Sequence, residues 1–244
     1  EKRCGKTRAI EVIRLFAPRA LPLASSISPA ALFRLVEKDR PTVFHDEAQG
    51  LACPKTETQQ ALNKILCAGN RQDAVVIRTV GDDYEPKTFR VYCPKVIALI
   101  GRLNEVLEDR AIVITMRRKK KDEKVERFRH RRAEQEAQDL RRRIARWVAA
   151  NSGAVEEAYN RVEPPGFLND RVAENWAPLL AVMQVAAPSL VPKLVEAAKE
   201  IEVENPEDES LGVQLLADIR QIFDTPGVEK ISTTPLLSRL KQLE

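Results

Sequence analysis

The tripeptide Gly5-Lys6-Thr7 constrains this chain most, because it matches the last three positions of the phosphate-binding pattern G-x-x-x-x-G-K-[S/T]. In that pattern, backbone N–H groups at a helix start face the phosphates, the lysine reaches the outer phosphates and the hydroxyl binds Mg²⁺. Gly5, Lys6 and Thr7 are therefore predicted to bind a nucleotide, with Thr7 also on the metal. The alternative is that the tripeptide is only the basic start of a helix.

The first glycine of the full pattern would fall immediately before Glu1. We therefore expect the chain to open inside the motif and to lack the strand that feeds such a loop. With no initiator methionine, the chain also resembles a segment of a longer protein.

A pair of acids follows the short β-rich run Thr42-Val43-Phe44-His45. In phosphoryl-transfer enzymes, an acid at a strand end binds the metal and a second acid beside it orients the attacking water. Asp46 is therefore predicted to bind Mg²⁺ and Glu47 to position water. The alternative is that both acids cap a helix beginning near Ala48, since acids favour helix N-termini.

Composition excludes several classes of protein. The net charge of +4 and the pI near 8.9 permit a nucleic-acid partner without requiring one. No C-x-x-C pair occurs, so neither a zinc site nor a disulfide framework is indicated, and reduced thiols predict a cytoplasmic protein. No apolar run is long enough to span a membrane, so no membrane partner is expected.

The first half of the chain alternates helical and β patterns, which predicts an α/β fold with a parallel sheet. Ser28-Pro29 is a helix start, and Gly69-Asn70 is a helix end. The expected helices cover residues 7–16, 28–36 and 57–68, the expected strands 42–44, 95–100 and 110–116, and a hairpin joins 74–80 to 87–93.

The second half is predicted to be helical. A charged segment with an apolar stripe, residues 122–150, should end at Asn151-Ser152-Gly153, and Asn169-Asp170 should cap the next helix. Further helices are expected at 193–200, after the cap Asn205-Pro206, and from Thr234-Pro235. The basic run 117–121 is followed by interleaved acids, which favours a solvated helix face over a phosphate-binding surface.

Two arginines are candidates for a nucleotide site. Arg110 precedes the expected strand 110–116, where oligomeric ATPases present an arginine to the neighbouring subunit's nucleotide. The alternative is a local surface pair with Asp109. Arg171 lies in the first turn of a helix, where the helix dipole disfavours a cation, so we predict that it senses nucleotide from a helical lid. A salt bridge to Glu174 is the alternative.

Taken together, these and other segments resemble an uncharacterised bacterial and phage family of P-loop ATPase domains, found in primase-helicase-like proteins of mobile elements. The resemblance covers nearly the whole chain and rests on residues 1–7, 27–34, 46–48, 76–83, 94–101, 109–114, 168–176 and 209–219.

The resemblance implies an AAA+-like P-loop NTPase core, a helical lid and the start of a winged-helix-like unit, at residues 1–121, 122–204 and 205–244. It implies ATP and Mg²⁺ as cofactors, single-stranded or forked DNA as partner, and a homo-oligomeric ring. By analogy with ring helicases, the hairpin at 74–93 would line a pore. Because its tip residues Asp82, Asp83 and Glu85 repel phosphate, DNA contacts would come from Arg78, Lys87 and Arg90.

The sequence departs from the family pattern in two respects. Arg8 follows Thr7 where a second small hydroxyl residue is frequent in the family. The expected strand 95–100 holds no polar residue that could serve as sensor between the acids and the phosphate, and Asn104 is the nearest candidate. Three hypotheses follow: an ATP-dependent DNA helicase or remodelling motor, a nucleotide-gated DNA-binding or loader module that hydrolyses little, and an inert segment.

Overall fold

The computed structural model describes residues 4–23, 26–80, 83–203, 211–224 and 230–240. The chain divides into two compact units, residues 1–195 and 196–244, which are described separately below.

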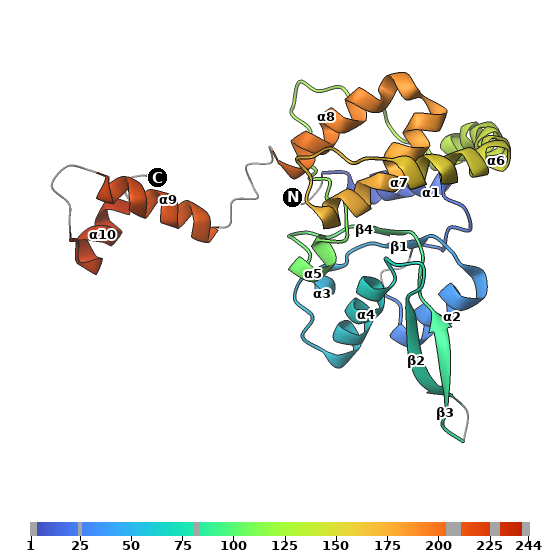
Figure 1. Ribbon diagram of the computed structural model, residues 1–244, viewed down its shortest axis with the longest axis horizontal. Coiled ribbons are helices and arrows are strands. Elements are labelled where there is room, and N and C mark those ends of the chain that lie inside the picture. The colour runs from blue at the N-terminus through green and yellow to red at the C-terminus, as the bar shows by residue number, and fades with distance from the viewer. Residues whose placement is uncertain (1–3, 24–25, 81–82, 204–210, 225–229, 241–244) are drawn as a thin grey trace. The chain divides into compact units, whose positions relative to one another are not determined.

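Two short parallel strands form the centre of the first unit (Figure 1). β1 (Val43–His45) pairs with β4 (Lys95–Ile97) in the register Val43↔Lys95 and His45↔Ile97. Since successive side chains point to opposite faces of a strand, Val43 packs into one apolar cluster and Phe44 into another. The parallel pairing and the burial of both faces agree with the α/β pattern of the sequence.

Helices cover both faces of this strand pair. α1 (Lys6–Phe16) places Ile10 against Phe44 and Ala98 on one face. α2 (Pro29–Asp39) and α4 (Glu57–Ala68) bury their apolar stripes in the cluster around Val43 on the other face. The hydroxyl of Ser28 caps α2, as predicted, and Thr56 and Gln59 form a capping box at α4.

A hairpin forms where one was predicted, but its second strand covers 85–90 instead of 87–93 and its tip is shorter than expected. β2 (Val75–Val80) pairs antiparallel with β3 (Glu85–Arg90), and Figure 1 shows the hairpin projecting from the body of the first unit. Its base is anchored by Phe89, which is buried with its ring centroid 4.6 Å from that of Phe33 in α2.

The prediction of a strand at 110–116 is wrong. Arg110 and Ala111 lie in the turn that ends the short helix α5 (Glu105–Glu108), and residues 112–116 have no regular structure because no described strand pairs with them. Their apolar side chains are not buried as in a central strand, since Val113 is 38% and Ile114 71% exposed. β4 is likewise shorter than expected and ends at Ile97.

The predicted helix end at Asn151-Ser152-Gly153 is also wrong. α6 (His130–Arg161) begins later than expected and continues through this tripeptide. The Asn151 side chain donates to Trp147 O at 2.8 Å, one turn back, which satisfies the amide inside the helix instead of ending it.

α6 packs against α1 and against α7 (Asp170–Ala186), whose N-cap is Asn169 as predicted. A 3₁₀ turn (Pro188–Leu190) then leads into α8 (Val191–Glu202), which holds the boundary between the two units. The first two predicted domains therefore lie largely within one compact unit. The division at 121 and 204 stays a prediction.

The second unit contains the end of α8, α9 (Leu211–Phe223) and α10 (Thr233–Leu240), and α9 packs against α10. The predicted cap Asn205-Pro206 lies outside the described residues. Residues 230–232, between α9 and α10, have no regular structure, and the winged-helix assignment stays a prediction. Among the described helices, none combines the length and the apolar character that crossing a membrane requires.

Candidate functional site

One cavity of about 460 Å³ brings together the phosphate-loop residues and the acid pair. Gly5, Lys6 and Thr7 line it from the start of α1, and Asp46 and Glu47 from the end of β1. The rest of its lining is Cys4, Arg8, Gln49, Ala98, Leu99 and Ile100. The predicted nucleotide and metal residues other than the two arginines are thus neighbours.

A direct hydrogen bond joins the two motifs. Thr7 Oγ1 donates to Asp46 Oδ2 at 2.8 Å across 39 positions of sequence. Asp46 Oδ1 accepts from the backbone N–H of Glu47 at 2.9 Å. The short helix α3 (Gln49–Ala52) has Ala48 as its N-cap, without a side-chain cap. Asp46 therefore hydrogen-bonds to Thr7 and to the backbone of Glu47. It does not cap the helix that begins near Ala48, which was the alternative.

Two left-handed backbone conformations occur in the loops of this cavity. Gly5, the N-cap of α1, has φ 92°, which glycine adopts without strain. Glu47 has φ 54°, which costs free energy for a residue with a side chain. The hydrogen bond from Ala48 N to Ala98 O, at 2.9 Å, ties this turn to the segment after β4. Strained residues of this kind cluster at functional sites, so the conformation of Glu47 supports a role for it.

Cations and acids are mixed in the cavity. Lys6 Nζ donates to Cys4 Sγ at 3.3 Å. Burial raises the pKa of the Cys4 thiol, but the hydrogen bond and charge of Lys6 oppose it, and the net effect is a pKa below the usual value. A thiolate-stabilising ammonium would equally stabilise a phosphate oxygen at this position.

Arg8 and Gln49 are lining residues that the sequence reasoning did not select. The Arg8 guanidinium lies 4.5 Å from the ring centroid of Phe128 and pairs with Glu11. The signal available in the sequence was their position directly beside the two motifs.

The donor set of this cavity fits Mg²⁺. Thr7 and Asp46 offer one hydroxyl and one carboxylate, both hard oxygen donors, already within hydrogen-bond distance of each other. In the part of the chain that the structure describes, no group of three acidic, histidine or cysteine side chains forms a metal cage. Mg²⁺ commonly binds through one or two protein oxygens together with water and substrate phosphates, so these two residues are a sufficient protein contribution.

The segment that follows β4 forms an apolar part of the lining, next to the turn that carries the acids. Ala98, Leu99 and Ile100 line the cavity where a polar sensor would be expected. Asn104 does not supply one, because its amide donates to Leu51 O at 2.8 Å and to Asn63 Oδ1 at 2.9 Å. Its Oδ1 accepts from Leu107 N and caps α5, so this side chain is structural.

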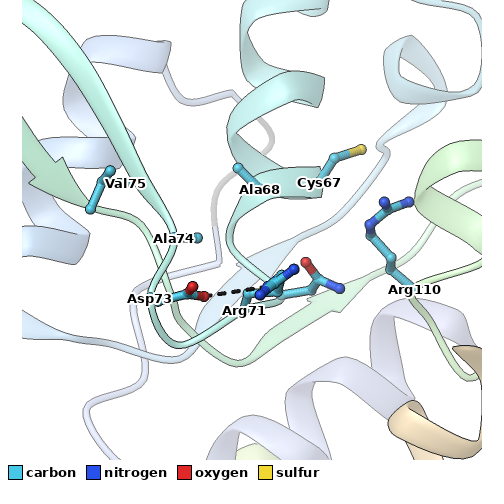
Figure 2. A pocket seen from close by; sticks show the side chains of 8 residues that line it. Cys67, Ala68, Arg71, Asp73, Ala74, Val75 and Arg110 are labelled. Carbon is cyan, nitrogen blue, oxygen red and sulfur yellow. Dashed lines mark hydrogen bonds and ion pairs between the residues drawn. The ribbon is translucent and has the colours of Figure 1, made fainter.

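Arg110 lines a different cavity, of about 350 Å³, at the end of α4. Figure 2 shows its guanidinium directed toward Cys67, with Arg71 paired to Asp73 nearby. Burial raises the pKa of the Cys67 thiol, although the charges of Arg110 and Lys95 act against it. The structure therefore does not bring Arg110 to Lys6 within one chain.

Arg171 is also outside the first cavity. Its Nη1 lies 2.9 Å from Asp109 Oδ2, so its partner is neither a nucleotide-site residue nor the expected alternative Glu174. Asp109 in turn pairs with Arg171 and not with Arg110. The position of Arg171 therefore does not support the predicted contact with a nucleotide bound by its own chain.

The hairpin separates the three cations that were predicted to contact DNA. Arg78 and Lys87 are directly opposite each other in the register, whereas Arg90 pairs with Val75 and faces the other side of the hairpin. The Arg78 and Arg34 guanidinium groups each lie 5.8 Å from the ring centroid of Phe33. Arg78 and Lys87 thus form a cationic pair on one face of the hairpin, and Arg34 lies near the same ring as Arg78.

The structure defines a mixed α/β protein whose Gly-Lys-Thr turn and acid pair share one cavity. Residues 115–244, more than half of the chain, match the family model described as a protein of unknown function, DUF3631, and the chain belongs to that family. The matched residues include α6 to α10 but none of those that line the first cavity.

A curated relative from Saccharopolyspora erythraea, named "Uncharacterized 28.9 kDa protein in xis 5'region", is 34% identical over 128 residues. That alignment covers 51% of this chain and 46% of the relative, so the chain spans about half the length of the curated relative it matches. No solved structure matches the chain significantly.

Proposed function

We propose that this chain is the nucleotide-binding part of an ATP- and Mg²⁺-dependent motor that remodels or unwinds DNA during replication of a mobile element. The observation that carries the proposal is the hydrogen bond from Thr7 to Asp46, at 2.8 Å. It joins a phosphate-loop motif and an acid pair that are far apart in sequence, and it does so at the wall of a cavity that Lys6 also lines.

Each residue of this cavity has a distinct role in the proposal. Lys6 and the N–H groups at the start of α1 bind the phosphates. Thr7 and Asp46 hold Mg²⁺, which when bound offsets the charge that develops on the phosphate oxygens. Glu47 is exposed and held in a left-handed turn, so its carboxylate is available to orient an attacking water.

DNA is the proposed substrate because of the hairpin. Arg78 and Lys87 sit opposite each other on a projecting β-ribbon, and closely spaced cations of this kind bind phosphate backbones. The resemblance to primase-helicase-like proteins supports the same substrate and a ring of identical subunits. In such a ring, Arg110 would act on the nucleotide of the neighbouring subunit.

A second function is favoured by the apolar wall of the cavity. With Ala98, Leu99 and Ile100 at that wall and Asn104 engaged elsewhere, no polar side chain of this segment is placed to sense the outer phosphate. A nucleotide-gated module that binds ATP, assembles and loads another protein while hydrolysing little would be compatible with that wall.

Steady-state ATP turnover with and without single-stranded DNA separates these functions. In the full natural protein, Lys6→Ala and Glu47→Gln are each expected to lower DNA-stimulated turnover by at least about 100-fold, because they remove phosphate binding and water positioning. Lys64→Ala, an exchange in α4 away from the cavity, is the matched control and should keep the full rate. Unchanged turnover in both cavity variants would refute the motor and favour the loader.

A further inference from the structure

The corner at Asp109 and Arg110 is held from a distant helix. Asp109 Oδ2 pairs with Arg171 Nη1 at 2.9 Å, and the Asp109 carbonyl accepts from Asn175 Nδ2 at 3.0 Å. Both partners lie in the first turns of α7, four positions apart and therefore on the same face of the helix. The start of α7 thus holds both the side chain and the backbone of Asp109.

The geometry of α7 makes this contact possible. Asn169 Oδ1 accepts from Arg171 N and Val172 N, at 3.1 and 3.0 Å, so the first turn of α7 is itself fixed. A cation at a helix N-terminus is disfavoured by the dipole, and the carboxylate of Asp109 offsets that cost. The pair is about half exposed, 54% and 55%, and exposed pairs add little stability. Stability therefore does not explain why Arg171 and Asp109 are paired beside Arg110.

Fixing Asp109 also fixes the backbone of Arg110. The Arg110 N–H is hydrogen-bonded to Leu107 O at 3.2 Å, and Arg110 Nη1 donates to Val106 O. Among the described residues, Arg110 has no acidic partner, so its guanidinium remains available for an anion at the second cavity.

We infer that Arg171 and Asn175 are positioning residues: they hold the Asp109–Arg110 corner so that Arg110 reaches a phosphate bound by a second copy of this chain. This inference rests on the proposed function. It assigns Arg171 to the subunit that donates the arginine, and not to the subunit that binds the nucleotide.

Mixing two impaired variants of the full natural protein tests the assignment. Arg171→Ala is expected to lower ATP turnover about 10- to 100-fold, as misplacement of a catalytic group does, while the Kd for MgATP stays within about twofold. An equimolar mixture of Arg171→Ala with Glu47→Gln should regain activity. At some interfaces, the intact nucleotide site of an Arg171→Ala subunit then faces the correctly held Arg110 of a Glu47→Gln subunit. In a head-to-tail ring, about a quarter of the interfaces would be productive.

Recovery in the mixture, together with partial recovery in the exchange Asp109→Arg with Arg171→Asp, would support the inference. Arg161→Ala is the matched control, since it removes an exposed arginine that pairs with Glu157 on α6, and it should leave turnover unchanged. No recovery in the mixture, or a loss of MgATP affinity that parallels the loss of turnover, would place Arg171 in its own subunit's site and overturn the inference.

Arg110→Ala distinguishes the failure of this inference from that of the proposed function. Full turnover in Arg110→Ala would overturn the role of that arginine and this inference with it. Loss of turnover in Arg110→Ala but not in Arg171→Ala would overturn this inference alone.

Hydrogen exchange gives a readout that needs no turnover. The amides of Arg110 and Ala111, bonded to Leu107 O and Glu108 O, should exchange measurably faster in Arg171→Ala than in the unaltered protein. Unchanged exchange would mean that α7 does not hold the corner.

Discussion

At the scale of single residues, the contact between Thr7 and Asp46 is too exposed to be explained by stability. A hydrogen bond of this kind contributes about 0.5–1.5 kcal/mol in the interior and less in water. What it does is place a hydroxyl and a carboxylate 2.8 Å apart beside Lys6. Such an arrangement is useful for binding Mg²⁺ and phosphate and has little other consequence for the fold.

His45 is the residue next to this site whose ionisation affects the fold. It is 8% exposed in β1, and its backbone carbonyl accepts from Ala98 N at 2.9 Å. Burial lowers the pKa of its imidazole, and the charge of Asp46 opposes that effect only in part. The folded protein therefore resists protonation of His45, whereas the unfolded chain takes up a proton near the usual pKa of about 6.5.

The free energy of unfolding should consequently fall as the pH drops from about 6.5 toward the lower pKa of the folded state, by at most about 1.4 kcal/mol per pH unit from this residue. His45→Gln removes the titrating group and should flatten that part of the profile. Urea unfolding at about pH 5 and about pH 7.5 measures both slopes. Equal acid slopes in the two proteins would contradict the assignment.

At the scale of elements, two glycines have different surroundings: one lies inside a helix with open space around it, and the other lies where two segments of backbone approach each other closely. A Cβ added at Gly153, inside α6, would meet nothing within 4 Å. A Cβ added at Gly69, at the end of α4, would lie 2.3 Å from Val91 O. Gly69 O also accepts from the half-buried Lys95 Nζ at 2.6 Å, so the end of α4 meets the segment between β3 and β4 there.

Gly153→Ala should therefore raise the free energy of unfolding by about 0.5–1 kcal/mol, because alanine favours a helix. Gly69→Ala should lower it by about 1–3 kcal/mol, since the carbonyl of Val91 must move. Equilibrium urea unfolding compares the two variants directly. A destabilised Gly153→Ala protein would mean that α6 is not continuous through residues 151–153.

The sequence predicted those elements whose signals are local. Ser28 and Asn169 cap helices as expected, and the hairpin forms from the two β-rich runs on either side of a turn, although its second strand is shifted. Asn151-Ser152-Gly153 failed as a stop signal because the Asn151 amide found a partner inside the helix. The run 110–116 has strand composition, but no composition can supply a neighbouring strand.

The candidate site shows the same difference between local signals, which the sequence carries, and long-range contacts, which it does not. Lys6, Thr7, Asp46 and Glu47 were predictable because their motifs carry their chemistry, and the structure brings them to one cavity. The partner of Arg171 was not predictable, because Asp109 lies 62 positions away and no local pattern indicates the contact.

At the scale of the whole molecule, the proposed ATP site and the proposed arginine occupy different cavities of the first unit. One chain therefore does not complete the proposed catalytic site by itself, and the account requires a second copy. The family match begins at Thr115 and runs to Glu244, so it includes the helices from α6 onward but neither cavity. The proposed nucleotide site consequently rests on its own geometry and on the motifs that form it.

The measurement that tests the central claim most directly is equilibrium binding of a fluorescent ATP analogue to the full natural protein, with Mg²⁺ and with EDTA. We predict saturable binding that weakens at least about tenfold without Mg²⁺ and in Lys6→Ala, because both the ammonium and the metal stabilise the phosphates. Thr7→Ser, which keeps the hydroxyl beside Asp46, should bind as the unaltered protein does, and Thr7→Val should lose the dependence on Mg²⁺. Binding that is absent, or that is equal in the unaltered protein and in Lys6→Ala, would contradict the claim that these residues form a nucleotide site.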